Sequence, residues 1–122
     1  MKRETDKPSV PSAPTCWQRE GPCACLRIET SGSEAQLFPY QHLVTASLSH
    51  IESSDILRLT FSSHDVEIAG RNLRALLLAL QDFTVKWLRS MPERYVQLGA
   101  GENGVITSIR IEGASSTSTL HV

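Results

Sequence analysis

The most suggestive chemistry in the sequence lies where Ser62, Ser63, His64 and Asp65 follow one another. Serine, histidine and aspartate are the residue types of a hydrolase triad, in which hydroxyl and carboxylate occupy opposite nitrogens of one imidazole. Adjacent residues of an extended chain point to opposite sides, so His64 and Asp65 are poorly placed for this arrangement. No Gly-x-Ser-x-Gly segment presents a nucleophile either. We therefore interpret the stretch as a four-residue turn and predict no catalytic residue.

Cysteine is the next reactive residue type, at positions Cys16, Cys23 and Cys25. Thiolates joined by a histidine could ligate a soft metal. However, the Cys-x₂-Cys spacing of a zinc knuckle is absent, and an odd number of cysteines cannot all pair within one chain. We predict free thiols, with Cys23 and Cys25 as weak metal candidates, and we expect no cofactor.

Four further residues could contact a ligand. Arg71 and Asn72, with Arg74 beyond them, precede or begin an expected helix, whose free N–H groups would suit an anion. The glycine pattern of a phosphate-binding loop is missing, however. His42 and His64 could supply polar groups at the rim of a pocket between helix and sheet. An anion or small-molecule site formed by Arg71, Asn72, His42 and His64 therefore stays open as an alternative function, possibly enzymatic.

The elements that would position these residues follow from hydrophobic periodicity. A two-residue period predicts strands in several short segments, namely 24–30, 35–40, 42–50, 55–61 and 66–70. A three-to-four-residue period follows, which predicts one long amphipathic helix that begins after Asn72 and ends before Pro92. One or two strands come last, at 95–100 and 105–112. We expect Asn72 to cap the helix.

This order predicts an α+β fold. A curled, mainly antiparallel sheet of six to seven strands (βββββ-α-β(β)) would pack one face against the long helix. The proline-rich segment 1–22 is expected to be a flexible arm, 23–112 the single folded domain, and the Ser/Thr-rich segment 113–122 a disordered tail.

The expected helix also has a second, narrower apolar strip on its outer side. Leu78 and Val85 are seven residues apart and would lie one above the other, flanked by Arg74, Gln81 and Arg89. Such a strip predicts a contact surface for a protein partner or a second copy of the chain. An exposed sheet edge open to strand addition is the other predicted surface.

Composition narrows the function classes further. The chain has 122 residues and a formal net charge of −1, which argues against the strongly basic footprint of most nucleic-acid-binding proteins. No apolar run approaches the ~20 residues that span a bilayer, and the N-terminus lacks the apolar region of a secretory signal. We therefore expect a cytoplasmic binding or oligomerisation module rather than an enzyme, with no membrane contact and nucleic acid an unlikely partner.

Overall fold

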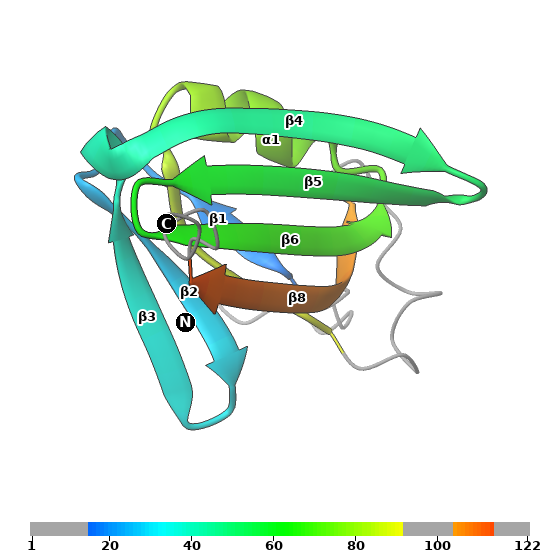
Figure 1. The fold of residues 1–122 in the computed structure, drawn as a ribbon, viewed down its shortest axis with the longest axis horizontal. Coiled ribbons are helices and arrows are strands. Elements are labelled where there is room, and N and C mark those ends of the chain that lie inside the picture. Colours follow the sequence, from blue (N-terminus) through cyan, green and yellow to red (C-terminus); the bar gives the residue numbers. More distant parts are fainter. Residues whose placement is uncertain (1–14, 92–103, 114–122) are drawn as a thin grey trace, which may run out of the picture.

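Among the residues that the structure describes, two four-stranded sheets and one α-helix share a single core (Figure 1). The computed structural model describes residues 15–91 and 104–113. The first sheet has the order β1-β7-β2-β3 and consists of β1 (Trp17–Arg19), β7 (Val85–Arg89), β2 (Cys25–Ser31) and β3 (Glu34–Pro39). The second sheet has the order β4-β5-β6-β8 and consists of β4 (Leu43–Ile51), β5 (Ser54–Phe61), β6 (His64–Arg71) and β8 (Val105–Gly113).

Two short helical connections link the two sheets. The 3₁₀-helix η2 (Tyr40–His42) joins β3 to β4, and α1 (Arg74–Gln81) joins β6 to β7, so each connection leads from one sheet to the other. All neighbouring strands are antiparallel except β2 and β7, which are parallel. The parallel pair arises because β7 returns from the second sheet and inserts between β1 and β2.

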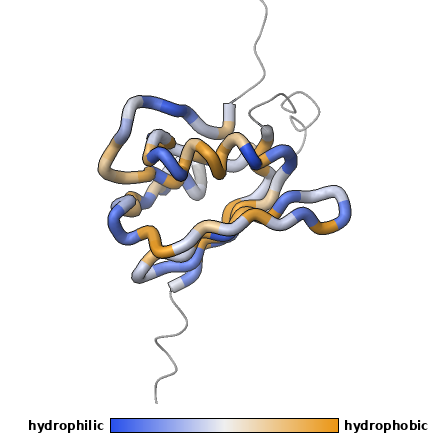
Figure 2. The backbone as a smooth tube through the Cα atoms, turned by 90° about the horizontal axis from the view of Figure 1, so that it is seen from above, coloured by the Kyte–Doolittle hydropathy of each residue, from blue (hydrophilic) through white to orange (hydrophobic). Residues whose placement is uncertain are grey.

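Buried apolar side chains from both sheets and from α1 form one hydrophobic cluster. The buried positions of β5 and β6 alternate along each strand, as a two-residue period requires, with Leu57, Leu59, Val66 and Ile68 all at most 1% exposed. Helix α1 contributes Leu76, Ala79 and Leu80 to the same cluster. Figure 2 shows the largely hydrophobic course of α1, which lies alongside the second sheet.

The predicted fold class, one curled sheet covered by a long helix, is wrong. Helix α1 has 8 residues and ends at Gln81, after which the chain turns and forms β7. At the turn Phe83 has φ 61°, its N–H donates to Leu80 O, and Thr84 N–H donates to Ala79 O. These bonds form a Schellman helix end. Glycine usually occupies the left-handed position, and because phenylalanine occupies it here, the sequence carries no evident stop signal.

An irregularity in β7 explains why its residues continued the helical pattern. Arg19 pairs with Val85 and Gln18 pairs with Trp87, so Lys86 is an extra residue at a β-bulge. The bulge places the buried residues Val85 and Leu88 three positions apart instead of two. A spacing of three is also the spacing of one helix face, and the periodicity therefore did not distinguish the two structures.

The helix also begins differently from the prediction. Asn72 is in the left-handed region with φ 56°, and the N-cap position belongs to Leu73, whose side chain makes no capping bond. Instead, the N–H of Leu73 donates to Oδ2 of Asp55 from β5 at 2.9 Å. The helix start is therefore fixed by a carboxylate from the neighbouring sheet.

The expected domain boundaries can be compared with the structure only at the described residues. Strand β1 lies within the range expected to be an arm, and Cys16 and Trp17 are 2% and 6% exposed in the core. The predicted arm at residues 1–14, the tail beyond residue 113 and the strand at 95–100 lie outside the described residues. The expected turn at 62–65 is shorter than predicted, because β6 begins at His64 and two residues connect it to β5.

Candidate functional site

Strand β4 is an edge of the second sheet that no other described strand covers, and its sequence has none of the features that usually protect an edge strand from pairing. Edge strands in monomeric proteins usually carry charges, proline or a very short length, which prevents them from pairing with other chains. Strand β8 carries Arg110 and Glu112, β3 carries Glu34 and Pro39, and β1 has 3 residues. Strand β4 has 9 residues, LVTASLSHI, with neither a carboxylate, a lysine, an arginine nor a proline. Among the described strands, β4 is thus the edge best suited to accept another strand.

The pairing of β4 with β5 determines which of its backbone groups face outward. Ile51 pairs with Ser54 across a two-residue turn, so these two residues bond to each other directly. Because bonding direction alternates along a strand, Ser49 and Ser47 also bond to β5. The N–H and C=O groups of Ala46, Leu48 and His50 therefore point to the open edge, where no described strand lies.

An apolar groove of about 320 Å³ runs along this edge, between β4 and α1. Its lining consists of Leu43, Ala46, Leu77, Leu78, Leu80, Gln81 and Phe83, none of which is charged. Leu78 and Phe83 are 44% and 47% exposed, which is unusual for such large apolar side chains. An apolar cavity of ~150 Å³ holds one benzene ring, so the groove has room for about two bulky side chains.

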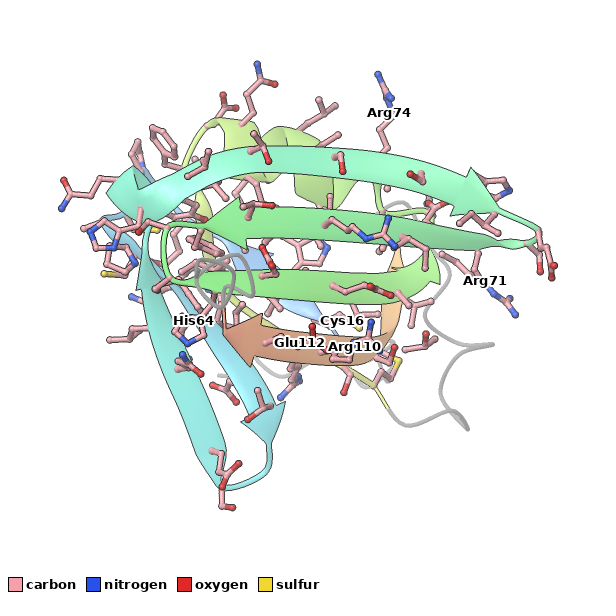
Figure 3. All side chains as sticks on the ribbon, in the orientation of Figure 1. Cys16, His64, Arg71, Arg74, Arg110 and Glu112 are labelled. Atoms are coloured by element: carbon pink, nitrogen blue, oxygen red, sulfur yellow. The ribbon has the colours of Figure 1, made fainter. Side chains whose placement is uncertain are left out.

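Helix α1 runs antiparallel to β4, so the groove has two different ends. Leu43, at the start of β4, shares the groove with Phe83 beyond the end of the helix. At the other end His50 contacts Asp55, with Nδ1 to Oδ1 at 2.6 Å, and Asp55 binds the helix start. Arg74 lies in the first turn of α1 at this second end, and its side chain extends past β4 toward the open edge (Figure 3).

The residues of the predicted outer helix strip lie in two different elements of the structure. Arg74, Leu78 and Gln81 are exposed residues of α1 as expected, and Leu78 and Gln81 line the groove. Val85 is 0% exposed in β7, so it cannot belong to an exposed strip. Arg89 is also in β7, where its Nε donates to Thr15 O at 3.1 Å. Because the helix ends at Gln81, these last two residues do not join the other three.

The residues proposed for a ligand site are spread over the molecule. His64 and Arg71 are the two ends of β6, which at ~3.4 Å per residue lie about 24 Å apart. His42 is exposed in η2, and Asn72 follows β6 beside Arg71. Figure 3 shows His64 and Arg71 at opposite ends of the sheet. The structure therefore does not bring these residues to one pocket.

His64 makes local contacts. Its Nδ1 lies 2.8 Å from Ser63 Oγ, its Nε2 lies 3.5 Å from Gln36 Nε2, and its ring packs edge-on against Phe38. Asp65 instead pairs with Thr60 in the β5–β6 ladder. The serine, histidine and aspartate are therefore part of a hairpin that packs against β3.

The three cysteines are separate thiols. Cys16 is buried and its sulfur accepts the N–H of Ile106 at 3.2 Å; burial raises its pKa. Cys23 Sγ contacts the carbonyl oxygens of Phe83 and Val85, and Cys25 is half-buried at the start of β2. Within residues 15–91 and 104–113 there is no cluster of three or more potential metal ligands. Nothing in these residues therefore strengthens the weak prediction that Cys23 and Cys25 bind a metal.

A second depression lies on the outer face of the second sheet, where charged residues of β5, β6 and β8 are aligned. Arg58, Glu67 and Arg110 are cross-strand neighbours. Glu67 Oε1 lies 3.7 Å from Arg58 Nε and 3.2 Å from Arg110 Nη2. Glu67 is therefore already paired with two arginines at this depression, which Asp65 and Glu112 also line. The apolar groove beside β4 is the stronger candidate for a binding site.

Comparisons of the chain with known protein families, curated proteins and solved structures find no match. Within the described residues, no helix is long and apolar enough to cross a membrane. The groove can therefore be interpreted only from its own geometry.

Sequence reasoning identified Leu78 and Gln81 but missed Leu43, Ala46 and Phe83 as members of one site. The signal that could have identified β4 was the uncharged run from Leu43 to Ile51, which is longer than an edge strand normally leaves unprotected. Phe83 gave no comparable signal, because its exposure depends on the end of the helix.

Proposed function

We propose that this chain is a non-enzymatic protein-interaction module that binds its partner along β4 and in the groove between β4 and α1. The observation that carries the proposal is the coincidence of an unprotected edge strand with an adjacent apolar groove. The strand offers backbone hydrogen bonds for affinity, and the groove offers side-chain contacts for specificity. Strand addition of this kind is a recurrent mode of peptide recognition.

One further feature supports the proposal, and the alternative has less support. Leu78 and Phe83 expose apolar surface next to the edge, as central contact residues do. The alternative, an anion or small-molecule pocket, has less support because its candidate residues lie apart and the groove has no charged lining. We also propose a cytoplasmic location, which the three free thiols favour, because cytosolic thiols remain reduced.

The experiment that tests the proposal selects a random decapeptide phage library against the full chain and measures self-association by sedimentation equilibrium. Leu78→Asp should weaken the binding that is found by tenfold or more, because it places a charge in the apolar groove. The matched control is Leu37→Asp, which changes an exposed leucine on β3, 63% exposed and outside the groove. Binding that is equally sensitive to both variants, or insensitive to Leu78→Asp, would contradict the proposal.

A further inference from the structure

We infer that the occupant of the groove is a single extended segment of a partner protein, with apolar side chains at two alternate positions and an acidic side chain two residues beyond one of them. The inference rests on the proposed function and specifies its ligand. It follows from the backbone of β4, from the position of α1 and from the charge of Arg74.

A second copy of the chain does not fit the edge. Antiparallel pairing of β4 with its counterpart would create a twofold axis perpendicular to the sheet and place the two strands ~4.8 Å apart. Helix α1 contacts β4 and β7, so it lies beside the edge strand itself. The two helices would then lie on the same face, and packed helices need 8–10 Å between their axes. A single strand avoids this conflict because it brings no helix.

The backbone of β4 determines the spacing of the ligand's side chains. A strand added to β4 would bond to the outward groups of Ala46, Leu48 and His50. Side chains directly opposite these residues point to the same face of the sheet, which is the face that carries α1. A ligand residue opposite Ala46, which lines the groove, would therefore enter it. The ligand residue opposite Leu48, which is partly buried against the core, would lie beside the groove on the same face, and the two ligand residues are separated by one residue. Apolar side chains suit both positions because neither the groove lining nor Leu48 is charged.

The third ligand position, opposite His50, lies at the end of the groove near Arg74. In the described part of the chain no ion pair includes Arg74 or Arg71. The side chain of Arg74 extends past β4 toward the open edge, whereas that of Arg71 points away from it (Figure 3). A carboxylate of the ligand would be attracted to Arg74. The ligand pattern is therefore apolar-x-apolar-x-acidic for a parallel strand and the reverse for an antiparallel one.

The test uses two synthetic nonapeptides, Ser-Thr-Leu-Thr-Val-Thr-Glu-Thr-Ser and its reversed sequence, labelled with fluorescein. Binding to the full chain is measured by fluorescence anisotropy. Each peptide has two controls, one in which lysine replaces glutamate and one of the same composition in which leucine and valine are adjacent. Adjacent residues of a strand point to opposite faces, so the second control can place only one apolar side chain on the face that carries the groove.

We expect one of the two directions to bind at least tenfold more tightly than its control with adjacent apolar residues. Replacing glutamate by lysine should weaken binding by up to about fivefold, as an exposed ion pair allows. Arg74→Glu should invert this preference, so that the lysine peptide binds better. The matched variant Arg71→Glu makes the same charge change away from the edge and should leave the preference unchanged.

Equal binding of the alternating and adjacent peptides, or a glutamate preference that Arg74→Glu does not alter, would overturn the inference. If neither nonapeptide binds while a selected peptide or self-association depends on Leu78, the inference fails and the proposed function stands. If Leu78→Asp changes no binding at all, both fail.

Discussion

Asp55, near the start of β5, accepts the backbone N–H of Leu73 on its Oδ2 at 2.9 Å, and this bond fixes the start of α1 against the sheet. Its other oxygen lies 2.6 Å from His50 Nδ1 on β4. One carboxylate thus connects the edge strand, its neighbour and the helix that form the groove. The proposed binding site depends on a contact between residues that are 18 positions apart in the sequence.

Asp55→Asn should therefore destabilise the fold and loosen α1. An asparagine can still accept a bond from Leu73 N–H but carries no charge for His50 or for the helix start. We expect a loss of about 1–2 kcal/mol in the free energy of unfolding, as for other helix-capping residues. Urea denaturation followed by circular dichroism measures it. Glu52→Gln, which removes a charge in the adjacent turn, is the control and should change stability by less than about 0.5 kcal/mol.

The same carboxylate predicts a pH dependence of stability. The hydrogen bond from His50, followed by those from the backbone N–H groups of Leu73 and Asn72, lowers the pKa of Asp55. A lowered pKa means that the folded state favours the charged form, so the contribution is complete above the unfolded value near ~3.9. It is lost as the pH falls through the folded pKa. Urea midpoints measured from pH 7 to pH 2.5 should decline less steeply for Asp55→Asn than for the natural chain; parallel curves would contradict this.

Tyr40→Phe should destabilise the junction between the two sheets. The phenol O–H of Tyr40, in η2, donates to Val85 O in β7 at 2.6 Å, and burial raises the pKa of this side chain. Phenylalanine would keep the ring and leave a buried carbonyl without this donor, at a cost of about 1–3 kcal/mol. Thermal unfolding measured by calorimetry tests this. An unchanged melting temperature would mean that water or another donor replaces the hydroxyl.

Gly70→Ala should be destabilising for a different reason. Strand β6 approaches β8 so closely at an irregular register that a Cβ on Gly70 would lie 2.0 Å from Val105 O, which is backbone. The strands would have to separate, at a cost of about 1–3 kcal/mol. Gly21→Ala has nothing within 4 Å of the new atom and serves as the control. Equal urea midpoints for both variants would contradict the close approach.

The fold could be predicted where a local hydrophobic pattern is compatible with only one type of secondary structure. The strands from β2 to β6 and β8 were predictable because their alternation repeats every two residues and because short turns separate most of them. The helix end was not predictable, since Phe83 occupies a position where glycine is the usual signal. The bulge at Lys86 then gave β7 the spacing of a helix. One missed turn changed a single sheet with a long helix into two sheets with a short one.

The candidate site was predictable to a similar degree. Arg74, Leu78 and Gln81 followed from the helix pattern, because they lie before its true end. Val85 and Arg89 did not, because they lie after it. The contribution of β4 could not be derived from periodicity, since an alternating strand looks the same at an edge and in the middle of a sheet. The order of strands decides this, and it depends on contacts between distant residues.

Hydrogen exchange of individual β4 amides tests the central claim most directly. In the free full chain, the amides of Ala46, Leu48 and His50 should exchange rapidly, whereas those of Ser47 and Ser49, which bond to β5, should be protected. Saturation with the tighter-binding nonapeptide should slow exchange at the first three amides and change the other two little. Protection at these three amides is the result that strand addition predicts. Protection confined to β8, β3 or β1, or bound peptide without any protection in β4, would contradict it.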